Sequence, residues 1–561
     1  MDADFEITEF MDEGVGFDCV FKQRFQDFIV REIDPFGNLV TLTDIEAPEH
    51  PTAKCQAATL ESVFDADTAQ LLSQLGDGQL SEVKIVCNEK SKDERARMHK
   101  CIREFFDSKL ESSTVNQQNE TAIIVRRTDL SAKGNCRKRK LWPHQQLGDY
   151  CCFVLYKENK DTQAAVASLA KKLHIKPGQI AVAGNKDRRA VTSQLASVYR
   201  IEAAQLTSLN GCLRSVKVGN CSYVKNSVFL GNLSGNHFSI VLRNVVGDKS
   251  VVSSCVERLE HRGFINYYGA QRFGTSNTPT YKVGRCILLK QWEQAVCLIL
   301  APKGRTDDDL EAARLEWAES KSATAALEKL SHRLRSTTVE GMLLTSLKKA
   351  PKGNYVVALK AIPRNMLNMY VHSYQSLLWN RLVSRRIQRF GVRTLQGDLI
   401  RKTGAAADEV SVVNADMVDD VSIYDLCLPI FAEKAQLPAN ECGKLYEEIL
   451  REENLEPANF GALSKQFSIH GGFRKLFVRP ADMEHRFVGY DDPTVPLVPT
   501  DLDLLEGRQP AEPTGEKFLA LIIEFSLPAG CYATMALREL CRIDMSKKAQ
   551  SMRNEYSQIH E

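Results

Sequence analysis

The sequence predicts an α/β protein in which one sheet-containing domain is interrupted by a second, more helical domain. Short runs rich in β-branched and aromatic residues, CCFVLYK at 151–157 and AVTSQLASVYRI at 190–201, predict strands. From about residue 280 to 475 the pattern changes to long helical stretches. Strand-like alternation returns at 473–480 and again at 519–540, so the residues of the sheet are expected to be split along the chain.

Composition and charge narrow the classes of protein. The 561 residues are 43% hydrophobic and 26% charged, with a net charge of only +2. These values are typical of a soluble protein of two or three domains and exclude a polybasic coat protein, so any RNA must be held by local basic patches. The sixteen cysteines include no C-x-x-C pair, which excludes a zinc ribbon and favours reduced thiols. The acidic N-terminus lacks the pattern of a secretory signal, and no stretch is expected to span a membrane.

The first 145 residues are predicted to form strands followed by an inserted segment. Residues 25–33 predict a strand, 34–38 a turn into a second strand, and 68–75 a helix. After residue 77, EKSKDERARMHKCIREFF predicts a charged helix and SSTVNQQNET a polar linker. The basic run at 137–140 is open to three interpretations: a solvated loop, an import signal or an RNA contact.

A short, stiff loop is predicted around Asp187. Residues 161–173 have helical spacing, and a turn at 176–178 leads into the apolar run 180–183. The residues GNKD at 184–187 follow that run directly, and another predicted strand comes after them. Asp187 is therefore expected on a turn between two strands. Further along, an aromatic and leucine stripe lies on one helical face and is interpreted as core packing: Tyr370, Tyr374, Leu377, Leu378 and Leu382.

Three separate segments contain the residues that could carry chemistry: KQRFQDFIVRE at 22–32, AGNKDRRAVTSQ at 183–194 and INYYGAQRFGTSN at 265–277. Together they supply one carboxylate, cations, an amide and aromatics, which suits recognition of a splayed-out RNA base. The alternatives are an exposed charged turn and ordinary core aromatics. A phosphate loop and a nucleophile elbow are both missing from the sequence.

These segments resemble the motifs of the TruD family of pseudouridine synthases. GNKDRRAVTSQ resembles G-x-K-D-x-x-A-x-T-x-Q, NYYGAQRFG resembles N-Y-[FY]-G-x-Q-R-F-G, and KQRFQDFIVRE resembles the N-terminal motif. GNHFSIVLRN, GGFRK and FSLPAGCYATMALRE also match in the family's order. The amino-acid sequence at 149–162 resembles that of the eukaryotic branch of the family. The resemblance implies a discontinuous catalytic domain with a mixed, largely antiparallel sheet and an inserted, more helical TRUD domain.

The resemblance also implies domain boundaries. We expect tails at 1–17 and 546–561, catalytic segments at 18–76, 145–279 and 476–545, a eukaryotic-type insertion at 77–144, and the TRUD insertion at 280–475.

The implied activity is isomerisation of uridine in RNA, with Asp187 as the catalytic carboxylate. Lys22 is expected to assist it, because a nearby cation favours ionisation of a carboxyl group in a desolvated pocket. The expected substrate-binding residues are Phe28, Asn266, Tyr268, Lys186 and Arg272. The expected contacts to the RNA backbone are Arg137, Lys138, Arg139 and Lys140. Tyr268 stands where bacterial members have phenylalanine, which keeps a stacking ring and adds a hydroxyl.

Neither a metal nor a cofactor is expected, because the reaction detaches uracil, rotates it and rejoins it through C5 without oxidation. The expected partner is RNA: transfer RNA, with small nuclear and messenger RNA as in the eukaryotic branch. We expect a monomer in the nucleus, the cytoplasm or both, with no membrane association. The alternative is a non-catalytic RNA-binding or chaperone protein of the same fold.

Overall fold

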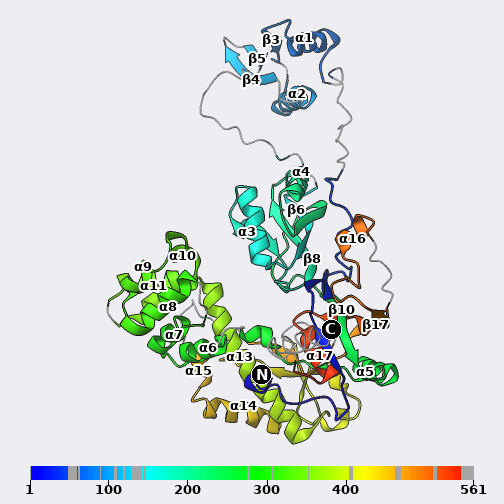
Figure 1. Ribbon diagram of the computed structural model, residues 1–561. Coiled ribbons are helices and arrows are strands. Elements are labelled where there is room, and N and C mark those ends of the chain that lie inside the picture. Colours follow the sequence, from blue (N-terminus) through cyan, green and yellow to red (C-terminus); the bar gives the residue numbers. More distant parts are fainter. Residues whose placement is uncertain are drawn as a thin grey trace. The chain divides into compact units, whose positions relative to one another are not determined.

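Figure 1 shows the computed structural model of the chain. It describes residues 2–48, 60, 63–88, 90–106, 110–117, 120–127, 142, 144, 147–274, 278–304, 308–351, 353–402, 409–461, 469, 471–508 and 515–544. The chain divides into two compact units, which are treated separately below. The larger unit combines Met1–Glu46 with Tyr150–Glu561, and the smaller one is Ala47–Asp149. The predicted contacts at 137–140 and the tail at 546–561 lie outside the described residues.

The larger unit is built on a sheet whose described residues form nine strands in the order β17-β18-β10-β2-β8-β6-β9, with β1 beside β10 and β7 beside β8. β2 and β8 run parallel, and the other pairs described are antiparallel. The strands are β1 (Asp18–Phe21), β2 (Phe28–Ile33), β6 (Tyr150–Glu158), β7 (Ile180–Val182), β8 (Val191–Tyr199), β9 (Val216–Val224), β10 (Gly235–Val246), β17 (Ala481–Tyr490) and β18 (Phe518–Pro528). The predicted mixed, largely antiparallel sheet, assembled from distant parts of the chain, is confirmed.

Alternation along the strands separates two cores. Successive side chains of a strand point to opposite faces. Phe28 and Ile240 therefore join the apolar core that includes residues of α5 (Lys249–Arg262) and α17 (Ala533–Cys541), whereas Ile29 and Val241 join a second core on the other face. The turn at 34–38 is followed by a single bridge between Ile33 and Leu39 rather than by the predicted second strand.

Residues 280–475 are mainly helical, as predicted, and share the core of the sheet. The 27-residue helix α13 (Arg364–Phe390) buries Tyr374, Leu377, Leu378 and Leu382, so the predicted stripe is core packing. Gly284 lies against this helix, because a Cβ there would be 2.1 Å from the Tyr370 carbonyl oxygen. The other helices here are α6 (Thr280–Leu288), α7 (Trp292–Ile299), α8 (Asp309–Ser320), α9 (Ala323–Glu328), α10 (His332–Thr337), α11 (Val339–Lys349), α12 (Tyr355–Leu359), α14 (Glu441–Glu452) and α15 (Pro457–Gly461).

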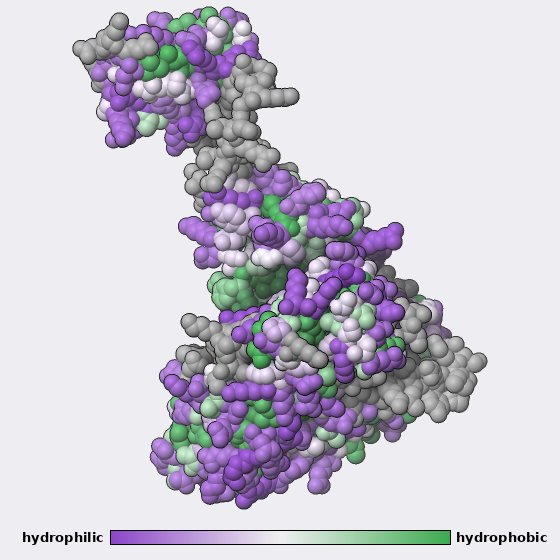
Figure 2. Space-filling view, turned by 90° about the vertical axis from the view of Figure 1, so that its left-hand side faces the viewer, coloured by the Kyte–Doolittle hydropathy of each residue, from purple (hydrophilic) through white to green (hydrophobic). Residues whose placement is uncertain are grey.

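Two small sheets connect the helices to the rest of the unit. They are β13-β12-β14-β15 and β11-β16. Their bounds are β11 (Phe264–Ile265), β12 (Leu399–Ile400), β13 (Ser411–Val412), β14 (Leu426–Pro429), β15 (Phe473–Lys475) and β16 (Phe477–Val478). In the view of Figure 2 the helical segment presents a largely hydrophilic surface, as expected when apolar stripes face inward. One core runs from the sheet into these helices, so a separate domain at 280–475 stays a prediction.

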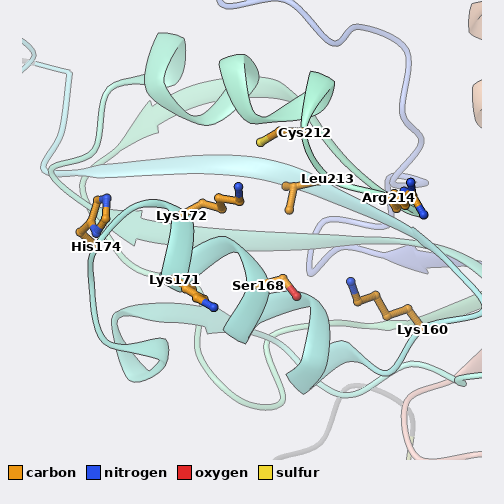
Figure 3. Close-up of a pocket in the computed structure, with 8 residues that line it drawn as sticks. All are labelled: Lys160, Ser168, Lys171, Lys172, His174, Cys212, Leu213 and Arg214. Atoms are coloured by element: carbon orange, nitrogen blue, oxygen red, sulfur yellow. The ribbon is translucent and has the colours of Figure 1, made fainter.

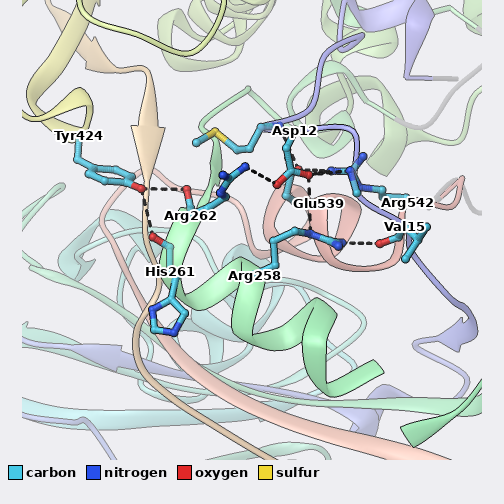
Figure 4. A network of polar contacts seen from close by, with 10 residues as sticks. Asp12, Val15, Arg258, His261, Arg262, Tyr424, Glu539 and Arg542 are labelled. Carbon is cyan, nitrogen blue, oxygen red and sulfur yellow. Dashed lines mark hydrogen bonds and ion pairs between the residues drawn. The ribbon is translucent and has the colours of Figure 1, made fainter. Parts of the chain in front are cut away.

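The predicted N-terminal tail is an integral part of the larger unit. Phe5 is buried and stacks on Phe273 at 4.6 Å between ring centroids. Further on, the Asp12 carboxylate accepts hydrogen bonds from Arg262 and Arg542, and Figure 4 shows this network between the N-terminal segment, α5 and α17. Apolar burial and charge pairing therefore fix residues that were expected to form a tail.

The smaller unit has its own core beneath a three-stranded sheet, β3-β5-β4. Its described elements are α1 (Ala66–Gly76), β3 (Glu82–Val86), α2 (Lys92–Phe105), β4 (Leu110–Gln117) and β5 (Glu120–Arg127). The predicted helices at 68–75 and 89–106 are confirmed, but the prediction of a polar linker at 112–121 was wrong. β4 pairs with β5 through backbone hydrogen bonds, which do not require apolar side chains. The unit also begins at Ala47 rather than at 77, because α1 packs on this sheet.

None of the described helices is both long and apolar enough to cross a membrane. The cysteines that the structure describes are free thiols.

Candidate active site

Asp187 lies on the loop between β7 and β8, and side-chain hydrogen bonds fix that loop from beneath. The Gln194 amide donates to the Gly184 carbonyl oxygen at 2.8 Å, and the Lys186 backbone N–H donates to the Thr162 hydroxyl at 3.0 Å. Thr162 in turn donates to the Gln194 amide oxygen at 3.2 Å. The aspartate side chain itself keeps 35% of its surface exposed. The loop therefore presents one accessible carboxylate on a fixed backbone, as the sequence predicted.

Lys22 reaches this carboxylate from the end of β1. Its ammonium donates to Asp187 Oδ2 at 2.7 Å and lies 3.6 Å from the centre of the Phe28 ring. Phe28 is 1% exposed, so it forms the apolar floor under the ion pair rather than an open wall. Lys22 has a φ of 52°, a left-handed conformation that is uncommon for a residue with a side chain. The structure brings Lys22, Phe28 and Asp187 together, as the motifs predicted.

A second lysine, Lys157 of β6, lies on the protein side of the loop. It is fully buried, and its ammonium donates to the Asp187 carbonyl oxygen at 2.7 Å and to the Lys186 carbonyl oxygen at 3.5 Å. Burial lowers the pKa of Lys157 to about 8, although the nearby Asp187 carboxylate opposes this shift. Sequence reasoning missed this residue, and its position within the predicted strand 151–157 was the available signal.

Lys186 does not take the substrate-binding position predicted for it. Its ammonium forms an ion pair with Glu32 at 2.5 Å, and the side chains are 5% and 0% exposed. Glu32 also accepts a hydrogen bond from the Leu195 backbone N–H at 3.1 Å. Asp187 therefore faces out from the loop, while Lys186 faces inward to Glu32.

The aspartate of the first motif is structural as well. Asp27 is 1% exposed and accepts hydrogen bonds from the fully buried Arg243 at 2.8 to 3.1 Å. It also accepts from the Arg24 backbone N–H at 2.7 Å, which closes the turn before β2. This pairing of an arginine with a carboxylate joins β10 to the turn and orients Phe28 beneath Lys22.

The third motif forms an aromatic cluster against α13. The Tyr268 backbone N–H donates to the Asn380 amide oxygen at 2.9 Å, and the tyrosine ring lies edge-on to Trp379 at 5.5 Å. The Arg474 guanidinium is 4.0 Å from the centre of the Tyr268 ring. The half-buried tyrosine is thus a ring held by a cation, suitable for stacking on a base. The sequence placed Arg474 in a matching motif but assigned it no role.

The side-chain amide of Asn266 forms its hydrogen bonds within the protein. It is 3% exposed, its amide oxygen accepts from Arg474 at 2.8 Å, and its amide nitrogen donates to the Lys475 carbonyl oxygen at 3.0 Å. This geometry does not fit the predicted contact with substrate through the amide and instead makes Asn266 the support of Arg474. Arg272 is half-buried, and its Nε donates to the Ser376 hydroxyl at 3.3 Å.

Comparisons with known proteins agree with this architecture. The family described as tRNA pseudouridine synthase D (TruD) matches residues 128–540. The chain therefore belongs to the TruD family of pseudouridine synthases, as the resemblance of its motifs predicted.

Individual relatives extend the match over nearly the whole chain. The chain is 40% identical to the "Pseudouridylate synthase 7 homolog" of Bos taurus, over 99% of this chain and 83% of the relative. It is 32% identical to the "Multisubstrate pseudouridine synthase 7" of Schizosaccharomyces pombe, over 98% and 92%. The crystal structure of a putative TruD from Methanosarcina mazei is 19% identical, covers 96% of this chain and 97% of its own, and matches with a TM-score of 0.56, which confirms the fold. The protein is thus a pseudouridine synthase, an isomerase whose class acts on RNA.

Proposed function

We propose that this enzyme isomerises uridine in transfer RNA and in further RNA classes, with Asp187 as the catalytic carboxylate. The observation that carries the assignment is the ion pair of Lys22 with the accessible Asp187 on the fixed loop. The family description names transfer RNA, and one relative is named a multisubstrate enzyme, which supports a range of substrates.

Each nearby group has a distinct task in this proposal. Asp187 acts on the ribose of the extruded nucleotide, either as nucleophile at the sugar carbon or as base toward a sugar proton. Lys22 fixes the carboxylate by its hydrogen bond, and Phe28 supports the Lys22 ammonium. Tyr268 stacks on a base, with Arg474 holding the ring in place. Arg272, from the same motif as Tyr268, contacts phosphate.

The test is the Asp187→Asn variant, assayed by tritium release from 5-tritiated uridine in transfer RNA. The variant preserves the shape of the side chain, so RNA binding is expected to stay within about twofold while release falls to background. Substantial release from the variant would refute the role of Asp187. If wild type and variant bind RNA equally and neither forms product, a non-catalytic RNA-binding function is supported instead.

We further propose that the enzyme acts as a monomer in the nucleus, the cytoplasm or both. The groups of the proposed site all come from one chain, and the basic run at 137–140 suits an import signal. Light scattering of the purified protein and imaging of a tagged chain with and without that run test these two proposals. Mapping of pseudouridine across cellular RNA with and without the protein defines the substrate classes.

A further inference from the structure

A basic groove lies on the larger unit between α3 (Thr162–Lys172) and the segment that follows the short helix η5 (Ser208–Gly211). Its volume is about 560 Å³, and none of the described residues that line it is acidic. Figure 3 shows side chains from both elements along the groove, with His174 and Arg214 at opposite ends. The basic members, called the groove residues below, are Lys160, Lys171, Lys172, His174 and Arg214.

The cations of this groove differ from the cations near the site that are held in ion pairs. Lys22, Lys186 and Arg243 are each paired with a carboxylate. Among the residues that the structure describes, no carboxylate pairs with the lysines or the arginine of the groove. Lys171, Lys172 and Arg214 are exposed. The chain has 73 basic and 71 acidic residues, so four unpaired cations in one hollow are a local excess rather than part of a global field.

The groove begins near the catalytic loop. Lys160 is two residues before Thr162, whose hydroxyl accepts the hydrogen bond from the Lys186 backbone. From there α3 extends over 11 residues, or roughly 16 Å, to Lys171 and Lys172 at its other end. A polyanion that entered the site at Asp187 could therefore continue along α3 over the groove residues.

We propose that this groove binds the phosphate backbone of the substrate RNA next to the modified uridine. The inference rests on the proposed RNA substrate and names a surface for it. Lysine ammonium groups bind phosphates as mobile point charges, which positions an RNA without reading its sequence. The apolar Leu213 and the small Ser168 leave room between the cations, and neither adds the directional hydrogen bonds that would select one small ligand.

The experiment compares two double variants. Lys171→Gln with Lys172→Gln removes the pair at the C-terminal end of α3. Lys348→Gln with Lys349→Gln is the matched control, because α11 also has 11 residues and also ends in two exposed lysines. Both variants change net charge equally and lose the same interaction with a helix dipole. Fluorescence anisotropy with a full-length transfer RNA measures the dissociation constant, and tritium release measures kcat and KM.

The groove variant is expected to raise the dissociation constant and KM while kcat stays near the wild-type value. Two lost contacts to a single strand weaken binding by roughly 25-fold at 0.1 M salt and lower the slope of log K against log salt by about 1.4. The control should stay within about twofold. Equal binding by the two variants would overturn the proposal, whether or not the wild type forms pseudouridine. Absence of product from the wild type would instead refute the proposed function.

Cys212 gives a second measurement that needs no charge change. Its side chain is exposed and lines the groove, so bound RNA should slow its labelling by a maleimide at least severalfold in the wild-type protein. An unchanged labelling rate at saturating RNA would contradict the proposal. Equal protection by a mononucleotide would indicate a small phosphorylated ligand and would also overturn it.

Discussion

Lys157→Met tests whether the buried ammonium beneath the loop positions Asp187. The substitution keeps a side chain of similar length and removes the donor to the Asp187 carbonyl oxygen at 2.7 Å. A hydrogen bond from a charged group contributes about 1.5–3 kcal/mol. If that energy keeps the loop in its reactive position, kcat should fall roughly 10- to 100-fold, since about 1.4 kcal/mol corresponds to tenfold.

Stability should respond differently from activity. The pKa of Lys157 is lowered from 10.5 to about 8, so keeping the ammonium charged inside the fold costs about 3 kcal/mol at neutral pH. Methionine removes that cost but leaves the Asp187 carbonyl without its donor, at about 1–3 kcal/mol. The two effects nearly cancel. Lys157→Met is therefore expected to unfold at about the wild-type temperature, while its kcat is much lower.

The free energy of unfolding and kcat depend on pH with opposite signs. The folded pKa lies below the unfolded one, so the unfolded chain binds more protons between about pH 8 and 10.5. The contribution of Lys157 to stability therefore rises with pH in that window, whereas kcat falls as the ammonium is lost. Asp187, Asp161, Lys186 and Lys22 are the charged groups that act on it; the two aspartates favour its protonated form and the two lysines oppose it.

The assay is tritium release under single-turnover conditions from pH 6 to 9.5, together with thermal unfolding. Lys217→Met is the control, because the Lys217 ammonium also donates to a backbone carbonyl, that of Asn210 at 2.8 Å. Wild-type kcat in Lys157→Met would refute the positioning role. So would a variant that loses kcat above pH 8 just as the wild type does.

Substitutions at three further positions probe the other contacts. Tyr268→Ala should lower turnover roughly 10- to 100-fold and Tyr268→Phe only slightly, because stacking contributes about 1–3 kcal/mol per base. Arg474→Lys should lower activity about tenfold or more, since lysine lacks the planar group that lies over Tyr268 and binds Asn266. Glu453→Gln should abolish part of the acid sensitivity of unfolding: burial opposes ionisation, but hydrogen bonds from Tyr374 and two arginines outweigh it and hold the Glu453 pKa at about 2.

Each of these variants has its own check. Equal losses in the two Tyr268 variants would assign the effect to the hydroxyl. Arg479→Lys is the control for Arg474, because the Arg479 guanidinium lies 4.1 Å from the centre of the half-buried Tyr424 ring, outside the three motifs of the site. For Glu453 the folded pKa is below the unfolded 4.5, so about 3 kcal/mol of stability is present above pH 4.5 and lost as pH falls toward 2. If the free energies of unfolding of the wild type and of Glu453→Gln fall in parallel between pH 4.5 and 2, this role of Glu453 is wrong.

The sequence predicted the sheet, the helical segment and the Asp187 loop, because each depends on local periodicity or on a contiguous motif. It could not assign side chains whose partners lie far along the chain. Lys186 is the neighbour of Asp187 in the sequence, yet the structure shows that its ammonium binds Glu32, whereas the ammonium of the distant Lys22 binds Asp187. Residues 112–121 were misread since an edge strand needs backbone pairing but few apolar side chains.

The buried charges explain why the motifs contain so many ionisable residues for a reaction that needs one carboxylate. Asp27 pairs with Arg243, and Glu32 pairs with Lys186. All four side chains are almost completely buried. Buried ion pairs often stabilise a fold no better than apolar residues of similar volume would. They do, however, join specific strands: β2 and its preceding turn are tied to β10 and to the Asp187 loop. The simplest physical reading is that these pairs fix the register of the elements that carry Lys22 and Asp187, so that their 2.7 Å contact is already formed before RNA binds.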